Sequence, residues 1–271
     1  MPDLIPTALD VLLLSNSTNT GEHTLAHARD EIARVAAGRA VVFLPFALED
    51  WDGYTARIQR ALDGIEVLGA HQLPCVDESI LEATCVFAGG GNTFRLLAAL
   101  QRLDLVCSLR ERILSGACSY IGSSAGTNIA GLSIRTTNDM PIVDTGSFTA
   151  LQLVPFQINP HFTDATIENL NAETRSERIA QFHEHSSTPV VGLYEGAWLR
   201  VTSGRAFVEG PGLEPVAKVF QPGITHVLND GDSVVPWWQH EPLDNMPSML
   251  GFLNNRHHRA ARSPLYPLKA I

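Results

Sequence analysis

Apolar runs of strand length alternate with helical spacing through the first half of the chain. The apolar runs are rich in Val, Leu and Phe, and they cover residues 8–16, 39–47, 66–73, 84–88 and 118–121. Helical spacing covers residues 24–38, 51–65, 77–83, 94–100 and 105–117, with Asp77 as a candidate N-cap. This alternation predicts an α/β domain built on a parallel sheet, in which chemistry gathers at the carboxyl ends of the strands.

The pattern changes after Gly131. An extended, polar stretch leads to a predicted helix over 173–185 and an antiparallel hairpin region over 189–212, with its turn at 203–205. Short strands follow, and the periodic pattern ends near Pro236. We therefore expect one α/β domain over residues 1–235 with a C-terminal antiparallel region. Residues 236–271 form a C-terminal extension of unknown role, interpreted as a tail or a partner-binding segment.

Composition narrows the class of protein. Lys and Arg total 19 against 29 Asp and Glu, and the net charge of −10 argues against a nucleic-acid binder. We expect no secretory signal and no membrane span, because no apolar run approaches the roughly 20 residues that a span needs. The four cysteines form no C-x-x-C pair, so neither a zinc site nor a redox motif is expected. Cys85 and Cys118 lie in apolar runs and are expected to be reduced core thiols of a cytoplasmic protein.

A G-x-S-x-G pattern stands at residues 122–126, between a strand-like and a helix-like segment. This is the setting of a nucleophile elbow, a sharp turn that exposes the central side chain, here Ser124. Gly122 and Gly126 remove Cβ atoms where the turn is crowded, and the following helix start favours a developing oxyanion. The pentapeptide alone leaves two readings open, a nucleophile or a glycine–serine turn without chemistry.

A serine nucleophile needs a base and a group that orients the base. Of the ten histidines, His161 stands out because it lies beside Pro160, in a bend after an apolar run. Asp139 and Glu195 are the candidate orienting acids, the second at the end of an apolar run just before a glycine. Each of the three residues also has a purely structural interpretation. His161 could be a packed histidine, Asp139 an Asx-turn cap and Glu195 a hairpin-turn residue.

A second glycine turn, residues 89–93, also follows a strand and opens a helix. It is not G-x-G-x-x-G, and the chain has no Walker lysine, so a nucleotide site has little support. Its better role is to aim one backbone N–H at the point that the Ala125 N–H also faces, as a second oxyanion-hole donor.

Several stretches together resemble the peptidase E family, the α-aspartyl dipeptidases of the serine-peptidase group that also contains cyanophycinase. The matching stretches run in order from about residue 8 to about residue 235: "VLLLSNS", "FLPFA", "AGGGNTFRLL", "YIGSSAGTN", "IRTTNDMPIVD", "QINPHFT", "ETRSERI" and "GLYEGAW". The resemblance implies a parallel-sheet sandwich flanked by helices, of the class I glutamine amidotransferase-like (flavodoxin-like) type. It also implies cofactor-free hydrolysis of small dipeptides with an N-terminal aspartate.

The resemblance assigns roles to particular residues. Ser124 is the implied nucleophile and His161 the implied base. Both acids have been linked to function in this family, and we favour Glu195 as the orienting acid, with Asp139 supporting the site or binding the substrate's amino group. Arg175 is the first candidate to hold the aspartyl carboxylate, because arginine can grip a carboxylate with two hydrogen bonds, and Arg135 is the second.

The implied oxyanion hole combines the N–H of Gly90 or Gly91 with that of Ala125.

Two positions depart from the family pattern. Ser123 stands where an aromatic residue is expected, and Tyr194 stands where proline is usual. Either change could alter substrate preference. A hydrolase with shifted specificity, for isoaspartyl or longer peptides, is therefore the first alternative, and a catalytically silent binding domain is the second. The sequence leaves homo-oligomerisation open.

Overall fold

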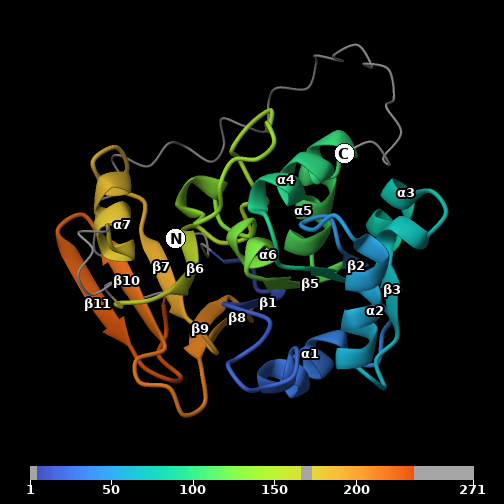
Figure 1. The fold of residues 1–271 in the computed structure, drawn as a ribbon, viewed down its shortest axis with the longest axis horizontal. Helices are drawn as coiled ribbons and strands as arrows, with labels where there is room; N and C mark the ends of the chain where they lie inside the picture. Colours follow the sequence, from blue (N-terminus) through green and yellow to red (C-terminus); the bar gives the residue numbers. More distant parts are fainter. Residues whose placement is uncertain (1–4, 166–172, 235–271) are drawn as a thin grey trace. The chain divides into compact units, whose positions relative to one another are not determined.

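Five parallel strands form the main part of a seven-stranded sheet (Figure 1). The structure is a computed structural model, and it describes residues 5–165 and 173–234. The strand order is β3-β2-β4-β5-β1-β8-β9, and β8 and β9 are antiparallel to their neighbours. The strands are β1 (Asp10–Leu14), β2 (Val41–Leu44), β3 (Val67–Gly69), β4 (Cys85–Ala88), β5 (Ser119–Ser123), β8 (Trp198–Thr202) and β9 (Arg205–Glu209).

Helices cover both faces of this sheet, and Figure 1 shows α1 and α2 on one side and α4 and α5 on the other. The elements are η1 (Ala26–Ala28), α1 (Arg29–Ala36), α2 (Trp51–Ala61), η2 (Ala70–Gln72), α3 (Val76–Glu82), α4 (Thr93–Arg102), α5 (Val106–Leu114), α6 (Ala125–Asn128) and η3 (Ile134–Thr136). Side chains alternate across a strand, and Leu12, Phe43 and Phe87 pack with α1 and α2. Their neighbours Val11, Val42 and Val86 are equally buried or nearly so, as expected of strands covered on both faces.

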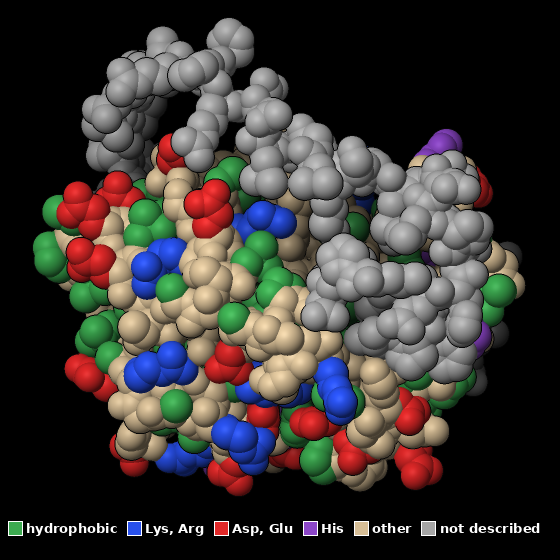
Figure 2. Space-filling model, turned by 180° about the vertical axis from the view of Figure 1, so that it is seen from behind, with side chains coloured by type: hydrophobic (Ala, Val, Ile, Leu, Met, Phe, Trp, Pro, Cys, Tyr) green, Lys and Arg blue, Asp and Glu red, His purple; other side chains and the backbone are tan. Residues whose placement is uncertain are grey.

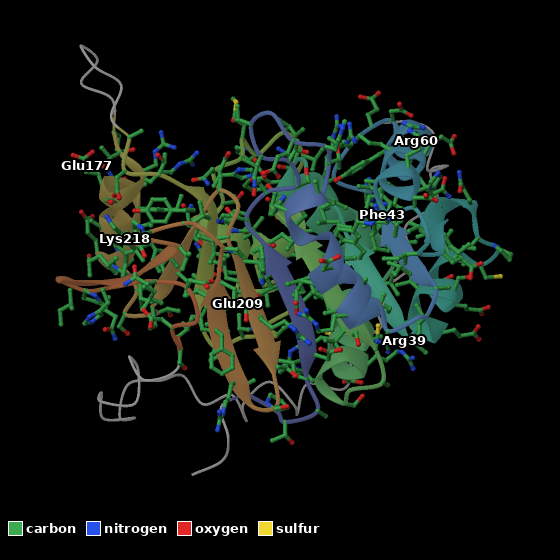
Figure 3. The ribbon with its side chains drawn as sticks, turned by 90° about the horizontal axis from the view of Figure 1, so that it is seen from below. Arg39, Phe43, Arg60, Glu177, Glu209 and Lys218 are labelled. Atoms are coloured by element: carbon green, nitrogen blue, oxygen red, sulfur yellow. The ribbon has the colours of Figure 1, made fainter. Side chains whose placement is uncertain are left out.

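The second half of the described chain adds a four-stranded sheet in the order β11-β10-β7-β6. Its elements are β6 (Gln157–Phe162), α7 (Arg175–His183), β7 (Val190–Tyr194), β10 (Ala217–Gln221) and β11 (Ile224–Leu228). Ile179 of α7 packs on this sheet against Phe162, Val190 and Phe220. Figure 3 shows Lys218 and Glu177, from β10 and α7, on the opposite side from Phe43 of β2. The strands after residue 156 therefore divide between two sheets.

The sequence pattern predicted most of these elements, with two corrections. Asp77 is not the N-cap of α3, because the helix begins at Val76 and Cys75 takes the cap position with a φ of 48°. Asp77 instead lies in the first turn, where its negative charge interacts favourably with the positive end of the helix dipole. His161 lies inside β6 and not in a loop after a strand, because a register shift between Asn159 and Phe162 absorbs the predicted bend.

The surface carries charges of both signs. Figure 2 shows Lys and Arg side chains interspersed with Asp and Glu over the face that it presents. Within the described residues, no helix is both long enough and apolar enough to cross a membrane. The predicted extension over residues 236–271 lies outside the described residues, so the domain boundary near residue 235 stays a prediction.

Candidate active site

Ser124 occupies a strained turn between β5 and α6. Its φ of 52° and ψ of −105° are unusual for a residue with a side chain, and such strain is found at functional turns. A Cβ on Gly122 would lie 2.6 Å from the carbonyl oxygen of Gly126, and a Cβ on Gly126 would overlap the carbonyl of Ala88. Both glycines are therefore required by crowding, as the sequence pattern predicted.

The Ser124 side chain begins a continuous hydrogen-bonded array. Its Oγ lies 2.7 Å from Nε2 of His161, and Nδ1 of His161 lies 2.9 Å from Oε1 of Glu195. A carboxylate accepts hydrogen bonds only, so the geometry places the imidazole proton on Nδ1 and leaves the Nε2 lone pair facing the serine. This is the tautomer that a general base requires.

Three elements from two sheets bring this array together. Ser124 follows β5 of the seven-stranded sheet, whereas His161 lies in β6 and Glu195 directly follows β7 of the four-stranded sheet. The short helix α6 packs on both β5 and β6, as Figure 1 also shows. The side chain of Glu195 is 57% exposed, so solvent screens its electrostatic interaction with His161, and its main effect is to orient the ring.

Asp139, the other candidate acid, contacts a different element. Its Oδ2 accepts from the backbone N–H of Thr93 at 2.7 Å and from the Thr93 hydroxyl at 2.6 Å. The Thr137 hydroxyl adds a longer bond of 3.3 Å to the same oxygen. Asp139 thus holds the first turn of α4, and the structure places Glu195, not Asp139, against His161.

The second glycine turn lies beside the nucleophile. A Cβ on Gly90 would lie 3.1 Å from the Cβ of Ser124, so only a glycine leaves this face of the turn open. The Gly90 N–H donates to the hydroxyl of the buried Tyr54, whose pKa is raised by burial. Gly91, with a φ of 131°, remains the candidate donor from this turn. Ala125 is the first residue of α6, and its N–H has no acceptor within the helix.

The two candidate arginines differ in their surroundings. Arg175 begins α7 and is half-buried, and burial lowers its pKa while the charges of Asp139 and Glu195 oppose that change. Its guanidinium is therefore within electrostatic reach of both acids of the site. The guanidinium of Arg135 lies 5.2 Å from the ring centre of Phe148 and is exposed. In the described part of the chain, it contacts no member of the array.

The structure also shows the surroundings of Ser123 and Tyr194, the two positions that depart from the family pattern. Ser123 is fully buried, and its hydroxyl has no hydrogen-bond partner among the described residues. The Tyr194 hydroxyl donates to Asp164, whose carboxylate also binds Lys218 of β10. The hydroxyl of Tyr194 therefore helps to fix the end of β7, the strand that Glu195 follows.

The sequence pattern did not reveal every residue at the site. It missed Tyr54 behind the glycine turn, and it missed Ser15 and Asn16, which follow β1 directly. The available signal was the polar "SNS" segment at the carboxyl end of a buried strand, where side chains of a site collect. No group of three or more His, Cys, Asp or Glu within the described ranges is arranged to hold a metal ion.

A mostly parallel α/β sheet that presents a serine after one of its strands, within reach of a histidine–carboxylate pair, is the arrangement of a serine hydrolase. Comparison with known proteins identifies the family within this class. The chain belongs to peptidase family S51, whose family model matches residues 11–208. The resemblance to the peptidase E family is confirmed by this match.

Named relatives cover most of the chain. The chain is 48% identical over 219 residues to "Peptidase E" of Streptomyces coelicolor. This alignment covers 79% of this chain and 88% of the relative. The chain is 44% identical over 209 residues to "Probable alpha-aspartyl dipeptidase" of Drosophila melanogaster, with 75% and 87% covered. The crystal structure of a peptidase from an acI-B1 Actinobacterium shares the fold with a TM-score of 0.58 at 16% identity, over 83% of this chain and 96% of that one.

Proposed function

We propose that this chain is a serine peptidase that hydrolyses dipeptides with an N-terminal aspartate through an acyl-enzyme. The observation that carries the proposal is the unbroken array from the Ser124 hydroxyl through His161 to Glu195. The substrate class comes from relatives, since proteins named "Peptidase E" and "Probable alpha-aspartyl dipeptidase" are 42–48% identical to this chain over aligned stretches of 209–234 residues.

The first half of the reaction forms the acyl-enzyme. His161 takes the proton from Ser124 as the serine oxygen attacks the scissile carbonyl, and Glu195 stabilises the imidazolium that results. The negative charge that develops on the carbonyl oxygen is held by the N–H groups of Ala125 and Gly91. The N-terminal end of α6 adds a favourable dipole at that point.

The second half releases both products. His161 returns its proton to the leaving amine, so the second residue of the dipeptide departs as a neutral amine. Water then enters, His161 takes one of its protons, and the hydroxide attacks the acyl group. Collapse of this second tetrahedral intermediate frees aspartate and restores Ser124. No step requires a cofactor.

Two charged groups beside the array fit the substrate's own charges. Arg175 would bind the aspartyl side-chain carboxylate, and its partial burial strengthens such a pair. Asp139 uses Oδ2 for its bonds to α4, and no donor within the described residues occupies Oδ1. That oxygen would accept from the substrate's free α-amino group. A substrate fixed at both charges would present its first peptide carbonyl to Ser124.

The strand order supports a finer fold assignment. Strands β2 to β5 take the order β3-β2-β4-β5, which corresponds to 2-1-3-4 of a flavodoxin-like sheet, and β1 fills the fifth position. This supports a class I glutamine amidotransferase-like fold. A cytoplasmic location is supported by the four cysteines, all of which are free thiols.

A substrate panel tests the proposal. We expect Asp-Leu to be hydrolysed, and Glu-Leu and acetyl-Asp-Leu to be cleaved at least about 100-fold more slowly. The extra methylene of Glu displaces the carboxylate from Arg175, and acetylation removes the amino-group charge that Asp139 would bind. Isoaspartyl-Leu belongs in the panel because Ser123 and Tyr194 depart from the family pattern. Faster cleavage of isoaspartyl-Leu than of Asp-Leu would favour the shifted specificity. No cleavage of any member, together with no labelling by a fluorophosphonate probe, would favour a silent binding domain.

A further inference from the structure

Three consecutive residues, the last of β1 and the two that follow it, bind the backbone of Ser124, of His161 and of the residue next to Glu195. The carbonyl oxygen of Leu14 accepts from the N–H of Ser124 at 3.1 Å. The hydroxyl of Ser15 accepts from the N–H of His161 at 2.9 Å. The Oδ1 of Asn16 accepts from the N–H of Gly196, the residue after Glu195, at 2.8 Å. One short segment thus sets the positions of nucleophile, base and acid.

Ser15 is the central link in this segment. Besides accepting from His161, its hydroxyl donates to the carbonyl oxygen of Leu193 at 2.8 Å. Leu193 lies in β7, two residues before Glu195. The side chain of Ser15 is fully buried, and both bonds are therefore shielded from competing water. A single hydroxyl joins the strand that carries the base to the strand that presents the acid.

The array needs such a link for two reasons. Ser124 stands on one sheet, whereas His161 and Glu195 stand on the other, so the distance from nucleophile to base depends on how the two sheets meet. His161 also has a φ of 56°, in the left-handed region that is unfavourable for a residue with a side chain. A bond to its N–H holds this conformation against relaxation to an extended one.

We propose that Ser15 is a positioning residue for the proposed hydrolysis, acting through the backbone of His161 and Leu193. The inference rests on the proposed function, because it concerns the same array. It assigns Ser15 no contact with the substrate and no part in proton transfer. Loss of its hydroxyl leaves the N–H of His161 without its acceptor and the carbonyl of Leu193 without its donor, so the imidazole loses its alignment with the Ser124 hydroxyl.

The test compares two buried serines at opposite ends of the sheet. We expect Ser15→Ala to lower kcat by roughly 10- to 100-fold with little change in KM, as a small misplacement of a catalytic group does. Ser119→Ala is the matched control. Ser119 begins β5, is 5% exposed and donates to Asp10 at the start of β1. Its loss therefore removes a hydroxyl hydrogen bond without touching the array. We expect it to lower the melting temperature while kcat and KM stay at wild-type values.

Two further variants make the result decisive. Ser15→Thr keeps the hydroxyl and should recover most of the lost kcat, which a general packing defect would not explain. If Ser15→Ala does not fold, Ser15→Cys replaces it, because a thiol is a much weaker hydrogen-bonding group. Wild-type kcat in Ser15→Ala or Ser15→Cys, or an equal fall in kcat for Ser119→Ala, would overturn the proposal.

The positioning role and the proposed function can fail separately. An inactive Ser124→Ala beside a fully active Ser15→Ala would remove the positioning role and leave the peptidase assignment intact. If the wild type cleaves no dipeptide in the panel, the rate at which a fluorophosphonate labels Ser124 becomes the readout. A slower labelling rate in Ser15→Ala than in Ser119→Ala would then support positioning, and equal rates would overturn it.

Discussion

At the residue scale, the two candidate acids make different contacts, whereas the sequence alone supported only a preference for Glu195 as the partner of His161. Glu195 lies 2.9 Å from the His161 ring, whereas Asp139 binds Thr93 at the start of α4. The same residue type therefore serves two purposes. One carboxylate contacts the proposed base, and the other stabilises a helix start and would, in the proposed function, bind the substrate's amino group through its second oxygen.

Amide substitutions distinguish these two acids. We expect Glu195→Gln to lower kcat by roughly 10²- to 10³-fold with little effect on KM, because the amide no longer selects the required tautomer of His161. The loss should be smaller than for a fully buried orienting acid, since Glu195 is half-exposed.

We expect Asp139→Asn mainly to raise KM and to lower the melting temperature, because it weakens both the amino-group contact and the cap of α4. Steady-state kinetics and thermal melts of the two purified variants provide the comparison. A kcat loss confined to Asp139→Asn would reverse the roles assigned to the two acids.

The residues that the sequence could nominate are those whose setting is local. Ser124, Gly122 and Gly126 were predictable because strand, turn and helix are contiguous in the chain. Ser15 was not, because its hydroxyl bonds join residues 146 and 178 positions apart. Contacts of this kind depend on how the two sheets pack, which no local pattern records.

At the scale of elements, the alternation of strands and helices was predictable and the assignment of strands to sheets was not. The hydrophobic period identifies a buried strand but not the edge that it joins. β7 and β8 are separated by only a short turn, yet they belong to different sheets. The turn between them carries Glu195, and the change of sheet at that point brings this acid to His161.

The packing of α6 against β4 is expected to tolerate no side chain at Gly126. We expect Gly126→Ala to lower the free energy of unfolding by about 3 kcal/mol or more, since the added Cβ overlaps the Ala88 carbonyl and the backbone must move. Gly146→Ala is the control, because the nearest atom to its added Cβ is the side-chain oxygen of Gln101 at 3.8 Å.

Urea unfolding of the two variants measures the difference. Equal stabilities would show that the elbow is less crowded than the geometry indicates.

At the scale of the whole molecule, the described chain is two sheets with the proposed site where they meet. The core of the larger sheet buries Cys85 and Cys118, whereas Cys75 and Cys107 are exposed. Burial raises the pKa of Cys85 to about 12 and that of Cys118 to about 11, which keeps both as unreactive thiols. The reactivity of the four thiols therefore shows whether the core around Cys85 and Cys118 excludes solvent and reagents.

Thiol titration tests the closed core. We expect Ellman's reagent at pH 8 to modify Cys75 and Cys107 within minutes in the native protein and all four thiols after denaturation. The neighbouring charge of Glu78 raises the pKa of Cys75, so Cys107 should react first. Rapid modification of a third thiol under native conditions would contradict the packing described here.

The central claim is that Ser124, and not its neighbour Ser123, is the nucleophile. Its most direct test is the rate of Asp-Leu hydrolysis by Ser124→Ala and Ser123→Ala, each checked by thermal melting. We expect Ser124→Ala to lose roughly 10³-fold or more in kcat while staying folded. We expect Ser123→Ala to remain within about tenfold of the wild type, because its buried hydroxyl makes no hydrogen bond to any residue that the structure describes. Near wild-type turnover by Ser124→Ala, with loss of activity in Ser123→Ala, would contradict the account.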